Sequence, residues 1–424
     1  MNIHGPLVEA ATHALGLVLK FELPADAVLS NYFRAHGALG QHDRGFVAEA
    51  VFGVLRHKRV LDHVTEDGNA RLLILGWLAR YSGLSMRDMS KALKSAELES
   101  TAQMKAISLD SLPNAVRAEL PDWIYTRLTR SMSEADIGQL GRALQNPAPL
   151  DLRVNTLHTD RERVLRELEL RGIEARETVF SPVGVRIPAK TALNREALFL
   201  EGAVEVQDEG SQLVGYLMAP RRNELVVDFC AGAGGKALML GAMMHSQGRV
   251  YAFDVSPARL SRLKPRLKRS GLSNLHPHLL RSENDPKVKR LAGKIDRVLV
   301  DAPCTGLGTL RRNPDLKWRQ SPGALEVLRH KQSSILNAAA GLVKRGGRLV
   351  YATCSLLQEE NEDVVEHFLT NHPDFRPLDC GEILRHQGID VTMPEHMRLW
   401  PHVHQTDGFF GAAFERSERS SFGR

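Results

Sequence analysis

The sequence predicts an all-helical N-terminal domain, a small α/β unit, and a larger C-terminal α/β domain with a doubly wound parallel sheet. From about residue 205 onward, short apolar strands alternate with helical segments, which is the pattern of strand–helix–strand units. The first third shows helical periodicity, and the segment Asn146-Pro147-Ala148-Pro149 breaks that pattern. A chain of 424 residues is also too long for one compact core, so several domains are expected.

The N-terminal domain, predicted over residues 1–145, consists of helices that each bury one apolar face. In the segment 43–56, apolar residues recur at a spacing that places them on one side of a helix: Phe46, Val47, Ala50, Val51, Val54 and Leu55. We expect Asp43 to cap the N-terminus of this helix. Further helices are predicted at 71–81, at 122–128, and after the candidate capping box Ser133-x-x-Asp136.

The small α/β unit is predicted over residues 150–204. A strand at 150–157 is followed by a helix that the box Thr159-x-x-Glu162 is expected to open. Further strand-like stretches lie near 173–179 and 183–187.

The larger α/β domain is predicted over residues 205–417, followed by a tail at 418–424. Its apolar strands are predicted at 225–229, 249–254, 297–301 and 348–353. Ligands of doubly wound sheets bind at the carboxyl ends of the strands. The residues directly after these strands are therefore the candidate site residues.

The charge distribution indicates a polyanionic partner. Lys plus Arg exceed Asp plus Glu by 56 to 50, and much of this excess gathers in the segments 259–269 and 311–319. We expect both segments to contact phosphate groups through their basic side chains. These are Arg259, Arg262, Lys264, Arg266, Lys268, Arg269, Arg311, Arg312, Lys317 and Arg319.

Other features exclude several classes of protein. No apolar stretch is long enough to span a bilayer and no signal peptide is recognisable, so we expect a cytoplasmic protein without a membrane partner. The four cysteines, Cys230, Cys304, Cys354 and Cys380, form no CxxC pair. We therefore expect neither a disulfide framework nor a metal site, and we interpret the isolated Cys380 as a packing residue. The sequence does not indicate an oligomeric state.

The first strand ends in a glycine-rich loop, Asp228-Phe-Cys-Ala-Gly-Ala-Gly-Gly-Lys236. Glycines allow a tight turn and a close approach of the backbone to a ligand in front of a helix N-terminus. The loop also satisfies the dinucleotide pattern G-x-G-x-x-G/A. Asp254 ends the second strand, where its carboxylate can accept hydrogen bonds from ribose hydroxyls. These features suit NAD and S-adenosylmethionine equally.

Two cysteines at the ends of two later strands distinguish between these cofactors. Cys304 follows the strand 297–301 in Asp301-Ala-Pro-Cys304, and Cys354 follows the strand 348–353. A single cysteine in such a place is typically a small buried hydrophobe. Two thiols at one sheet edge, with Asp301 close to one of them, indicate nucleophilic catalysis.

Methylation of an aromatic carbon explains such a pair. Cytosine C5 is a poor nucleophile, and the addition of a thiolate at C6 pushes electron density onto C5, which then attacks a sulfonium methyl group. The C5 proton must then leave so that the enzyme thiol is eliminated, which requires a second group nearby. Protonation of the ring at N3, or a hydrogen bond to it, stabilises the adduct, and this role is open to Asp301.

These motifs resemble those of the RsmB-like (Sun/Fmu-type) RNA cytosine-C5 methyltransferases over nearly the whole chain. The glycine loop is similar to the family's CAAPGGK motif, with Gly232-Ala233 in place of Ala-Pro. The other matching blocks are Arg153-Val-Asn-Thr156, Asp301-Ala-Pro-Cys304-Thr-Gly, Arg311-Arg-Asn-Pro-Asp-Leu-Lys-Trp318, Thr353-Cys354-Ser355 with Glu359-Glu-Asn361, and Asp407-Gly-Phe-Phe410. Asp43-Arg44 and Gly53-Val-Leu-Arg56 resemble the family's NusB-like helical domain.

The resemblance implies that residues 150–204 form an RNA-recognition unit and that a Rossmann-like class I methyltransferase domain follows it. It also implies S-adenosylmethionine as cofactor and ribosomal or transfer RNA as substrate. It implies that Cys354 is the nucleophile and that Cys304 assists product release, with Asp301 and Lys236 facing the base. The cofactor-binding residues would be Cys230, Ala231, Gly232, Ala233, Gly234, Gly235, Lys236, Asp254, Asn284 and Asp301. The third cofactor-contacting position falls within Glu283-Asn284-Asp285, where we assign Asn284.

Three alternatives remain open from the residues. A DNA cytosine-C5 methyltransferase would use the cysteine of its Pro-Cys motif, here Cys304, as the nucleophile. An NAD-dependent oxidoreductase accounts for the glycine loop and leaves both cysteines without a role. A non-catalytic RNA-binding protein with a relic cofactor fold would not need Lys236, Asp301 and both thiols together.

Overall fold

The computed structural model describes residues 3–66, 68–188, 191 and 193–418. The chain divides into two compact units: a helical unit, Met1–Pro147 with Thr309–Pro322, and a sheet unit, Ala148–Gly308 with Gly323–Arg424. The division into domains at 1–145, 150–204 and 205–417 remains a prediction. Of the predicted tail 418–424, all but the first residue lies outside the described residues.

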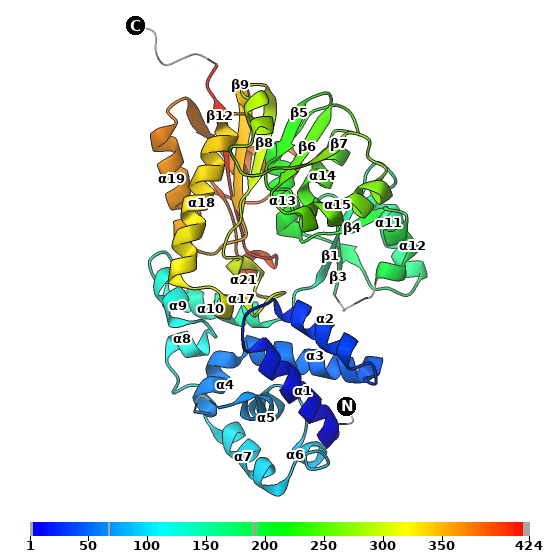
Figure 1. Cartoon of the computed structure of the whole chain (residues 1–424), viewed down its shortest axis with the longest axis vertical. Coiled ribbons are helices and arrows are strands. Elements are labelled where there is room, and N and C mark those ends of the chain that lie inside the picture. The colour runs from blue at the N-terminus through cyan, green and yellow to red at the C-terminus, as the bar shows by residue number, and fades with distance from the viewer. Residues whose placement is uncertain (1–2, 67, 189–190, 192, 419–424) are drawn as a thin grey trace. The chain divides into compact units, whose positions relative to one another are not determined.

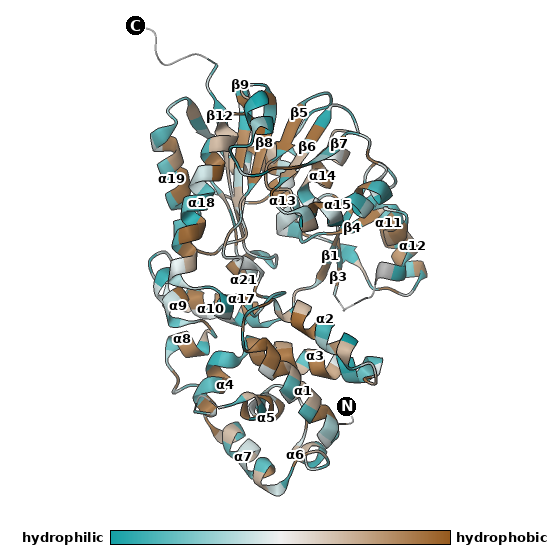
Figure 2. Cartoon of the chain, viewed as in Figure 1, coloured by the Kyte–Doolittle hydropathy of each residue, from teal (hydrophilic) through white to brown (hydrophobic). Residues whose placement is uncertain are grey.

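The helical unit buries the apolar faces of its long helices against one another, as Figure 2 shows for α1, α3 and α5. Val8, Val47 and Leu78, one from each of these helices, are completely buried in its core. The helices are α1 (Gly5–Val18), α2 (Ala25–Ala35), α3 (Gln41–Arg56), α4 (Lys58–Val64), α5 (Ala70–Arg80), α6 (Met86–Met89), α7 (Ser95–Ala106), α8 (Asn114–Arg117), α9 (Asp122–Leu128), α10 (Glu134–Gln145) and α17 (Leu316–Arg319).

Two predicted helix caps are wrong in detail. The helix α3 begins at Gln41 after Gly40, so Asp43 lies in its first turn and accepts a hydrogen bond from the Gly40 N–H at 3.3 Å. The predicted box at Thr159 also fails, since the side chain of the next residue, Asp160, accepts from the Arg163 N–H. A carboxylate outcompetes a hydroxyl for the exposed N–H groups at a helix N-terminus, because the positive end of the helix dipole also stabilises its negative charge.

The remaining helix predictions are confirmed. The helices α5 and α9 cover the predicted segments 71–81 and 122–128 to within a residue. Ser133 caps α10, its hydroxyl oxygen accepting from the Asp136 N–H at 3.2 Å while the hydroxyl itself donates to the Asp136 carboxylate.

The sheet unit begins with a small antiparallel sheet of order β2-β3-β1-β4. Its helix α11 packs Val164 and Leu168 against Leu152 and Val185 of the sheet. The elements are β1 (Leu150–Val154), α11 (Arg161–Leu170), β2 (Arg176–Glu177), β3 (Gly184–Ile187), α12 (Ala197–Leu200) and β4 (Val204–Val206).

A large twisted sheet of order β10-β12-β9-β8-β5-β6-β7 forms the centre of the sheet unit (Figure 1). Its strands are β5 (Leu225–Asp228), β6 (Arg249–Asp254), β7 (Leu275–Leu279), β8 (Ile295–Asp301), β9 (Val343–Thr353), β10 (Phe375–Leu378), β11 (Met397–Leu399) and β12 (Phe409–Arg416). The strands β5 to β9 pair in parallel, which confirms the predicted fold class and the four predicted strands.

The central strands of this sheet are apolar on both faces, and helices bury both faces (Figure 2). One face packs against α13 (Glu209–Met218), α14 (Gly235–Met243), α15 (Pro257–Ser270) and α20 (Cys380–His386). The other packs against α16 (Pro286–Arg290), α18 (Pro322–Ala340) and α19 (Glu362–Asn371). A short helix α21 (Pro401–His404) precedes β12. As the packing predicted for it implies, Cys380 is completely buried.

The sheet is mixed, whereas the sequence predicted a parallel one. The strand β12 runs antiparallel to its neighbours β9, β10 and β11. These late strands were not predicted from the sequence, and neither was β7, which contains Pro277. A proline is tolerated there because β7 is the edge strand and one side of its backbone needs no partner. Among the described residues, no helix is long and apolar enough to cross a membrane.

Candidate active site

The glycine loop between β5 and α14 adopts a turn that only glycine accommodates easily. Gly232 and Gly234 have φ angles of +56° and +84°, in the left-handed region. A Cβ atom on Gly234 would lie 2.1 Å from Cδ1 of Leu263, whereas one on Gly232 would meet no atom within 4 Å. The loop is therefore packed on one side at Gly234 and leaves space at Gly232.

Asp254 fixes this loop from the end of the neighbouring strand β6. Its Oδ2 accepts from the Gly232 N–H at 2.8 Å, and its Oδ1 accepts from the Ser256 N–H at 2.7 Å. The side chain is buried. Because each carboxylate oxygen has more than one lone pair, Asp254 can still accept a hydrogen bond from a ligand hydroxyl.

Lys236 and Asp301 form an ion pair that joins the first turn of α14 to the end of β8. The Lys236 Nζ lies 2.8 Å from the Asp301 Oδ2, and it also lies over the Phe409 ring at 5.3 Å. Burial is the largest single effect and lowers the pKa of Lys236, but the charge of Asp301, the hydrogen bond with it and other nearby negative charges together outweigh burial, so the pKa is raised overall. Lys236 is buried while Asp301 remains 31% exposed, which leaves the carboxylate accessible to a ligand.

The structure brings the two predicted catalytic thiols together. The Sγ atoms of Cys304 and Cys354 lie 3.5 Å apart, and both cysteines are free and partly exposed. The hydrogen bond with Cys354 and burial raise the pKa of Cys304 well above its ordinary value. A negative charge on Cys354 also contributes to the raised pKa of Lys236. These surroundings favour a neutral thiol on Cys304.

A buried carboxylate, Glu360, connects the loop that carries Cys304 to the loop that carries Cys354; we call these the two thiol loops. Its Oε1 accepts from the Thr305 N–H at 2.9 Å, and its Oε2 accepts from the hydroxyls of Thr305 and Ser355. Thr305 follows Cys304 and Ser355 follows Cys354, so one side chain binds the neighbour of each thiol. Gln332 on α18 donates to Glu360 Oε1 at 2.9 Å and to the Pro303 carbonyl at 3.0 Å.

Backbone contacts between glycines add a second connection. The Gly308 N–H donates to the Cys354 carbonyl at 2.8 Å, and the Gly408 N–H donates to the Gly308 carbonyl at 2.8 Å. A Cβ on Gly308 would lie 2.1 Å from the Gly408 oxygen, so the close approach requires glycine. This explains physically why glycine occurs in both the block after Cys304 and the Asp407-Gly-Phe-Phe410 block.

The Glu359-Glu-Asn361 block had no predicted role. Asn361 accepts from the Thr353 hydroxyl at 2.6 Å and donates to the Ser355 carbonyl at 3.2 Å, so it also orders the loop of Cys354. Asp228 was likewise given no role. It is buried at the end of β5, no described residue donates a hydrogen bond to its Oδ1, and burial with the nearby charge of Asp301 raises its pKa to about 7.

The third cofactor-contacting position remains a prediction. Glu283 accepts from the Ser334 hydroxyl at 2.7 Å, and Asp285 caps α16 by accepting from the Lys287 N–H at 2.9 Å. Asn284 is exposed, so of the three side chains it is the most accessible to a ligand. The described residues contain no group of three His, Cys, Asp or Glu side chains suited to a metal ion.

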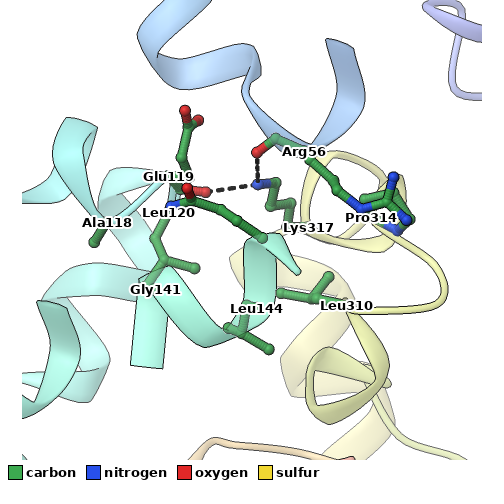
Figure 3. A pocket seen from close by; sticks show the side chains of 10 residues that line it. Arg56, Ala118, Glu119, Leu120, Gly141, Leu144, Leu310, Pro314 and Lys317 are labelled. Atoms are coloured by element: carbon green, nitrogen blue, oxygen red, sulfur yellow. Dashed lines mark hydrogen bonds between the residues drawn. The ribbon is translucent and has the colours of Figure 1, made fainter. Parts of the chain in front are cut away.

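The predicted phosphate contacts require correction. Arg266 and Arg269 pair with the buried Glu205, and Lys317 is itself buried. Arg266 and Arg269 bind a carboxylate and Lys317 binds two backbone carbonyls (Figure 3), so these three charges are already paired within the protein. In the first basic segment the exposed side chains are Arg259, Arg262, Lys264 and Lys268, which all lie on α15.

Comparisons with known proteins give a consistent result. A family model described as 16S rRNA methyltransferase RsmB/F matches residues 215–415. A second, described as the ferredoxin-like domain of RsmF/B-like methyltransferases, matches residues 120–194. The chain is 32% identical to a probable ribosomal RNA small subunit methyltransferase B of Synechocystis, over 92% of this chain and 95% of that protein. It is 30% identical to ribosomal RNA small subunit methyltransferase B of Serratia proteamaculans, over 95% and 96%.

Solved structures share the fold. The crystal structure of PH0851 aligns with a TM-score of 0.80 and 25% identity, over 98% of this chain and all of that chain. The crystal structure of NSun6 from Pyrococcus horikoshii with SFG aligns with a TM-score of 0.63 and 21% identity, over 71% of this chain and 99% of that chain.

We expect Glu360→Ala to lower the free energy of unfolding by about 2–4 kcal/mol, because it leaves buried N–H donors of Thr305 and Gln332 without acceptors. Glu360→Gln should cost less, since the hydroxyls of Thr305 and Ser355 can rotate to accept from the new amide. Urea denaturation measures both. The control is Glu366→Ala at an exposed position of α19, and a Glu360→Ala value equal to this control would contradict the assigned role.

Proposed function

The chain belongs to the RsmB/F family of rRNA methyltransferases, and from this premise we propose that it methylates the C5 carbon of a cytosine in RNA through a covalent enzyme–base adduct. The single observation that carries this proposal is the 3.5 Å separation of the Cys304 and Cys354 sulfurs. Methylation at an oxygen, or at a nitrogen with its own lone pair, does not require a thiol pair.

The methyl donor of the proposed reaction is S-adenosylmethionine, which supplies an electrophilic methyl group. The residues at the sheet edge suit it: the Gly232 turn leaves space, Asp254 has free lone pairs, and Asp301 is partly exposed. NSun6, which was crystallised with SFG, an analogue of this donor, has the same fold. We assign donor binding to residues 230–236, Asp254 and Asp301, with Asn284 as the third contact.

In the proposed mechanism, the Cys354 thiolate attacks C6 of the cytosine, and the C5–C6 π electrons move onto C5, which takes the methyl group. Proton transfer to N3 neutralises the negative charge that develops on the ring: the Asp301 carboxyl group, which lies 2.8 Å from the Lys236 ammonium, donates this proton and takes it back when the adduct collapses. The C5 proton then passes to a water molecule, the C5–H electron pair re-forms the C5–C6 double bond, and the C6–S bond breaks with its electron pair returning to the Cys354 sulfur. Cys304, a neutral thiol 3.5 Å away, assists this release by donating a hydrogen bond to the departing thiolate.

Two alternatives are less well supported. The DNA-type mechanism would make Cys304 the nucleophile, but its pKa is raised by the hydrogen bond with Cys354 and by burial. A non-catalytic RNA-binding protein would not need the buried Lys236–Asp301 ion pair beside two free thiols. The relatives named above are ribosomal RNA small subunit methyltransferases, so we propose small-subunit ribosomal RNA as the substrate in preference to transfer RNA.

Isothermal calorimetry should detect binding of S-adenosylmethionine and of its demethylated product. Gly234→Ala should weaken this binding about tenfold or more, because a non-glycine residue at this φ costs roughly 1–2 kcal/mol and its Cβ would clash with Leu263. Gly172→Ala is the matched control, since Gly172 also has a positive φ, of +70°, but lies after α11, outside the glycine loop, and a Cβ there would meet no atom within 4 Å. Binding of NAD in place of S-adenosylmethionine would overturn the proposal.

RNA affinity should fall steeply with salt, and the exposed side chains of α15 should account for part of this slope. For single-stranded RNA, replacing Arg262 and Lys264 by Gln should reduce the slope of log K against log salt by about 1.4, or roughly 0.7 for each lost contact. The control is Arg376→Gln on β10. This strand lies at one edge of the sheet, whereas α15 connects β6 and β7 at the other edge. An unchanged slope in the double variant would remove α15 as a contact surface.

Flexible RNA should bind better than a duplex, since the base must be unstacked.

The two thiols should behave differently when each is replaced. Cys354→Ala should abolish both methyl transfer and the covalent RNA adduct, because the bond to C6 cannot form. Cys304→Ala should methylate once and then stall, leaving a complex that survives denaturing electrophoresis. An adduct that accumulates only in Cys354→Ala would exchange the two roles. Normal activity in both variants, with no adduct, would exclude covalent catalysis.

A further inference from the structure

The block Arg153-Val-Asn-Thr156 has no role in the proposed reaction. Its first residue lies on β1 of the small antiparallel sheet, directly opposite Glu205 of β4. Side chains at such a pair of positions lie on the same face of a sheet and are close enough to interact. Both side chains are buried, so their charges must be satisfied by partners within the protein.

Arg153 binds the glycine loop directly. Its Nη1 donates to the Gly235 carbonyl at 2.6 Å and also to the side-chain carbonyl of Gln207. Burial lowers the pKa of Arg153 to about 10, while the charge of Glu205 opposes this decrease, so the guanidinium stays charged at neutral pH. Gly235 is the first residue of α14, so Arg153 holds the helix at the point where the loop ends.

A second arginine binds the loop two residues earlier. The helix α15 lies beside β4, and Nη1 of its Arg266 donates to the Ala233 carbonyl at 2.7 Å (Figure 1). The Nε and Nη2 atoms of Arg266 donate to Glu205 Oε2 at 3.1 and 2.9 Å, which fixes the orientation of the guanidinium. Glu205 therefore connects Arg266 to the small sheet and lies opposite Arg153, so that two cations and one anion form a single cluster at the glycine loop.

The two arginines fix the direction of peptide groups in the loop. The C=O and the N–H of a trans peptide lie in one plane and point in opposite directions. Contacts to the carbonyls of Ala233 and Gly235 therefore also set the direction of the N–H groups of Gly234 and Lys236. The N–H of Lys236 belongs to the first turn of α14, where N–H groups have no partner within the helix and can donate to a ligand.

Asn155, the third residue of the block, provides an internal comparison. It is also buried, and its Nδ2 donates to the carbonyls of Gly202 and Ser270, both at 3.0 Å. These contacts hold the small sheet to the end of α15. No described hydrogen bond of Asn155 reaches the glycine loop. Arg153 and Asn155 therefore differ in what they hold: the first binds the loop, and the second binds the end of the helix.

We propose that Arg153 and Arg266 are positioning residues for the methyl donor: by binding two carbonyls of the glycine loop, they hold this loop in the shape that binds S-adenosylmethionine. The small sheet then contributes to donor binding, in addition to any part it plays in recognising RNA. The inference rests on the proposed function for the identity of the donor, but it concerns binding and does not depend on methyl transfer.

The test uses the full chain with Arg153→Met, which keeps an apolar stem and removes every donor. Asn155→Ala is the matched control, because it removes buried hydrogen bonds made by the same block without removing a contact to the loop. The first readout is hydrogen exchange in the ligand-free proteins, followed by mass spectrometry on peptides from 228–238. We expect exchange there to become about tenfold faster in Arg153→Met and to stay unchanged in Asn155→Ala.

The second readout is donor binding, measured by calorimetry below the temperature at which each variant unfolds. We expect the Kd for S-adenosylmethionine to rise about tenfold in Arg153→Met, because the loop is no longer held in its binding shape, and to stay unchanged in Asn155→Ala. Arg153→Lys, which keeps the charge, should recover part of the loss. In turnover, KM for the donor should rise while kcat at saturating donor changes little, which is the signature of lost binding.

If Arg153→Met does not fold, Arg266→Met replaces it, because this side chain is 21% exposed and its loss leaves less buried polar surface without a partner. Unchanged loop exchange and unchanged donor affinity in both arginine variants would overturn the inference, whatever their thermal stability. An equal loss of donor affinity in Asn155→Ala would also overturn it, since any loosening of the small sheet would then have the same effect.

A wild-type protein that binds S-adenosylmethionine but does not methylate cytosine would count against the proposed reaction only. In that case, weaker donor binding in Arg153→Met than in Asn155→Ala would still support the positioning role.

Discussion

The active site depends on one buried carboxylate. Glu360 is completely buried, and such a group is stable only when hydrogen-bond donors surround it. These donors come from the loop after β8, the loop after β9 and the helix α18, so satisfying Glu360 forces the three segments together. The 3.5 Å separation of the sulfurs follows from this constraint, since each thiol is adjacent in sequence to a residue that Glu360 binds.

The sheet and its edge could be predicted because they depend on local patterns. The strands β5, β6, β8 and β9 are buried on both faces, so each appears as an apolar run that ends in a polar residue. The carboxyl ends of parallel strands meet at one edge, which was sufficient to group Lys236, Asp301 and both thiols. The role of Glu360 could not be predicted in this way, because its partners come from three separated segments and a glutamate is expected to be exposed.

Buried cations were mispredicted for a related reason. A cluster such as Arg311-Arg-Asn-Pro-Asp-Leu-Lys-Trp318 indicates a surface for phosphate when only its composition is known. Lys317 is buried because the end of α3 supplies a carbonyl that lacks a partner within the helix, and that carbonyl is more than 200 positions away in sequence. Arg266 is similar, since it binds Glu205 and the Ala233 carbonyl of the glycine loop. In both cases the tertiary partner determines whether the charge is available to RNA.

The same carboxylate that orders the thiol loops also acts on the protonation of one sulfur. The negative charge of Glu360 contributes to the raised pKa of Cys304, after the hydrogen bond with Cys354 and burial. All three effects oppose a negative charge on Cys304, so this sulfur keeps its proton at a distance of 3.5 Å from the Cys354 sulfur. Glu360 therefore connects the two thiol loops and also helps to keep the proton on one of the two sulfurs.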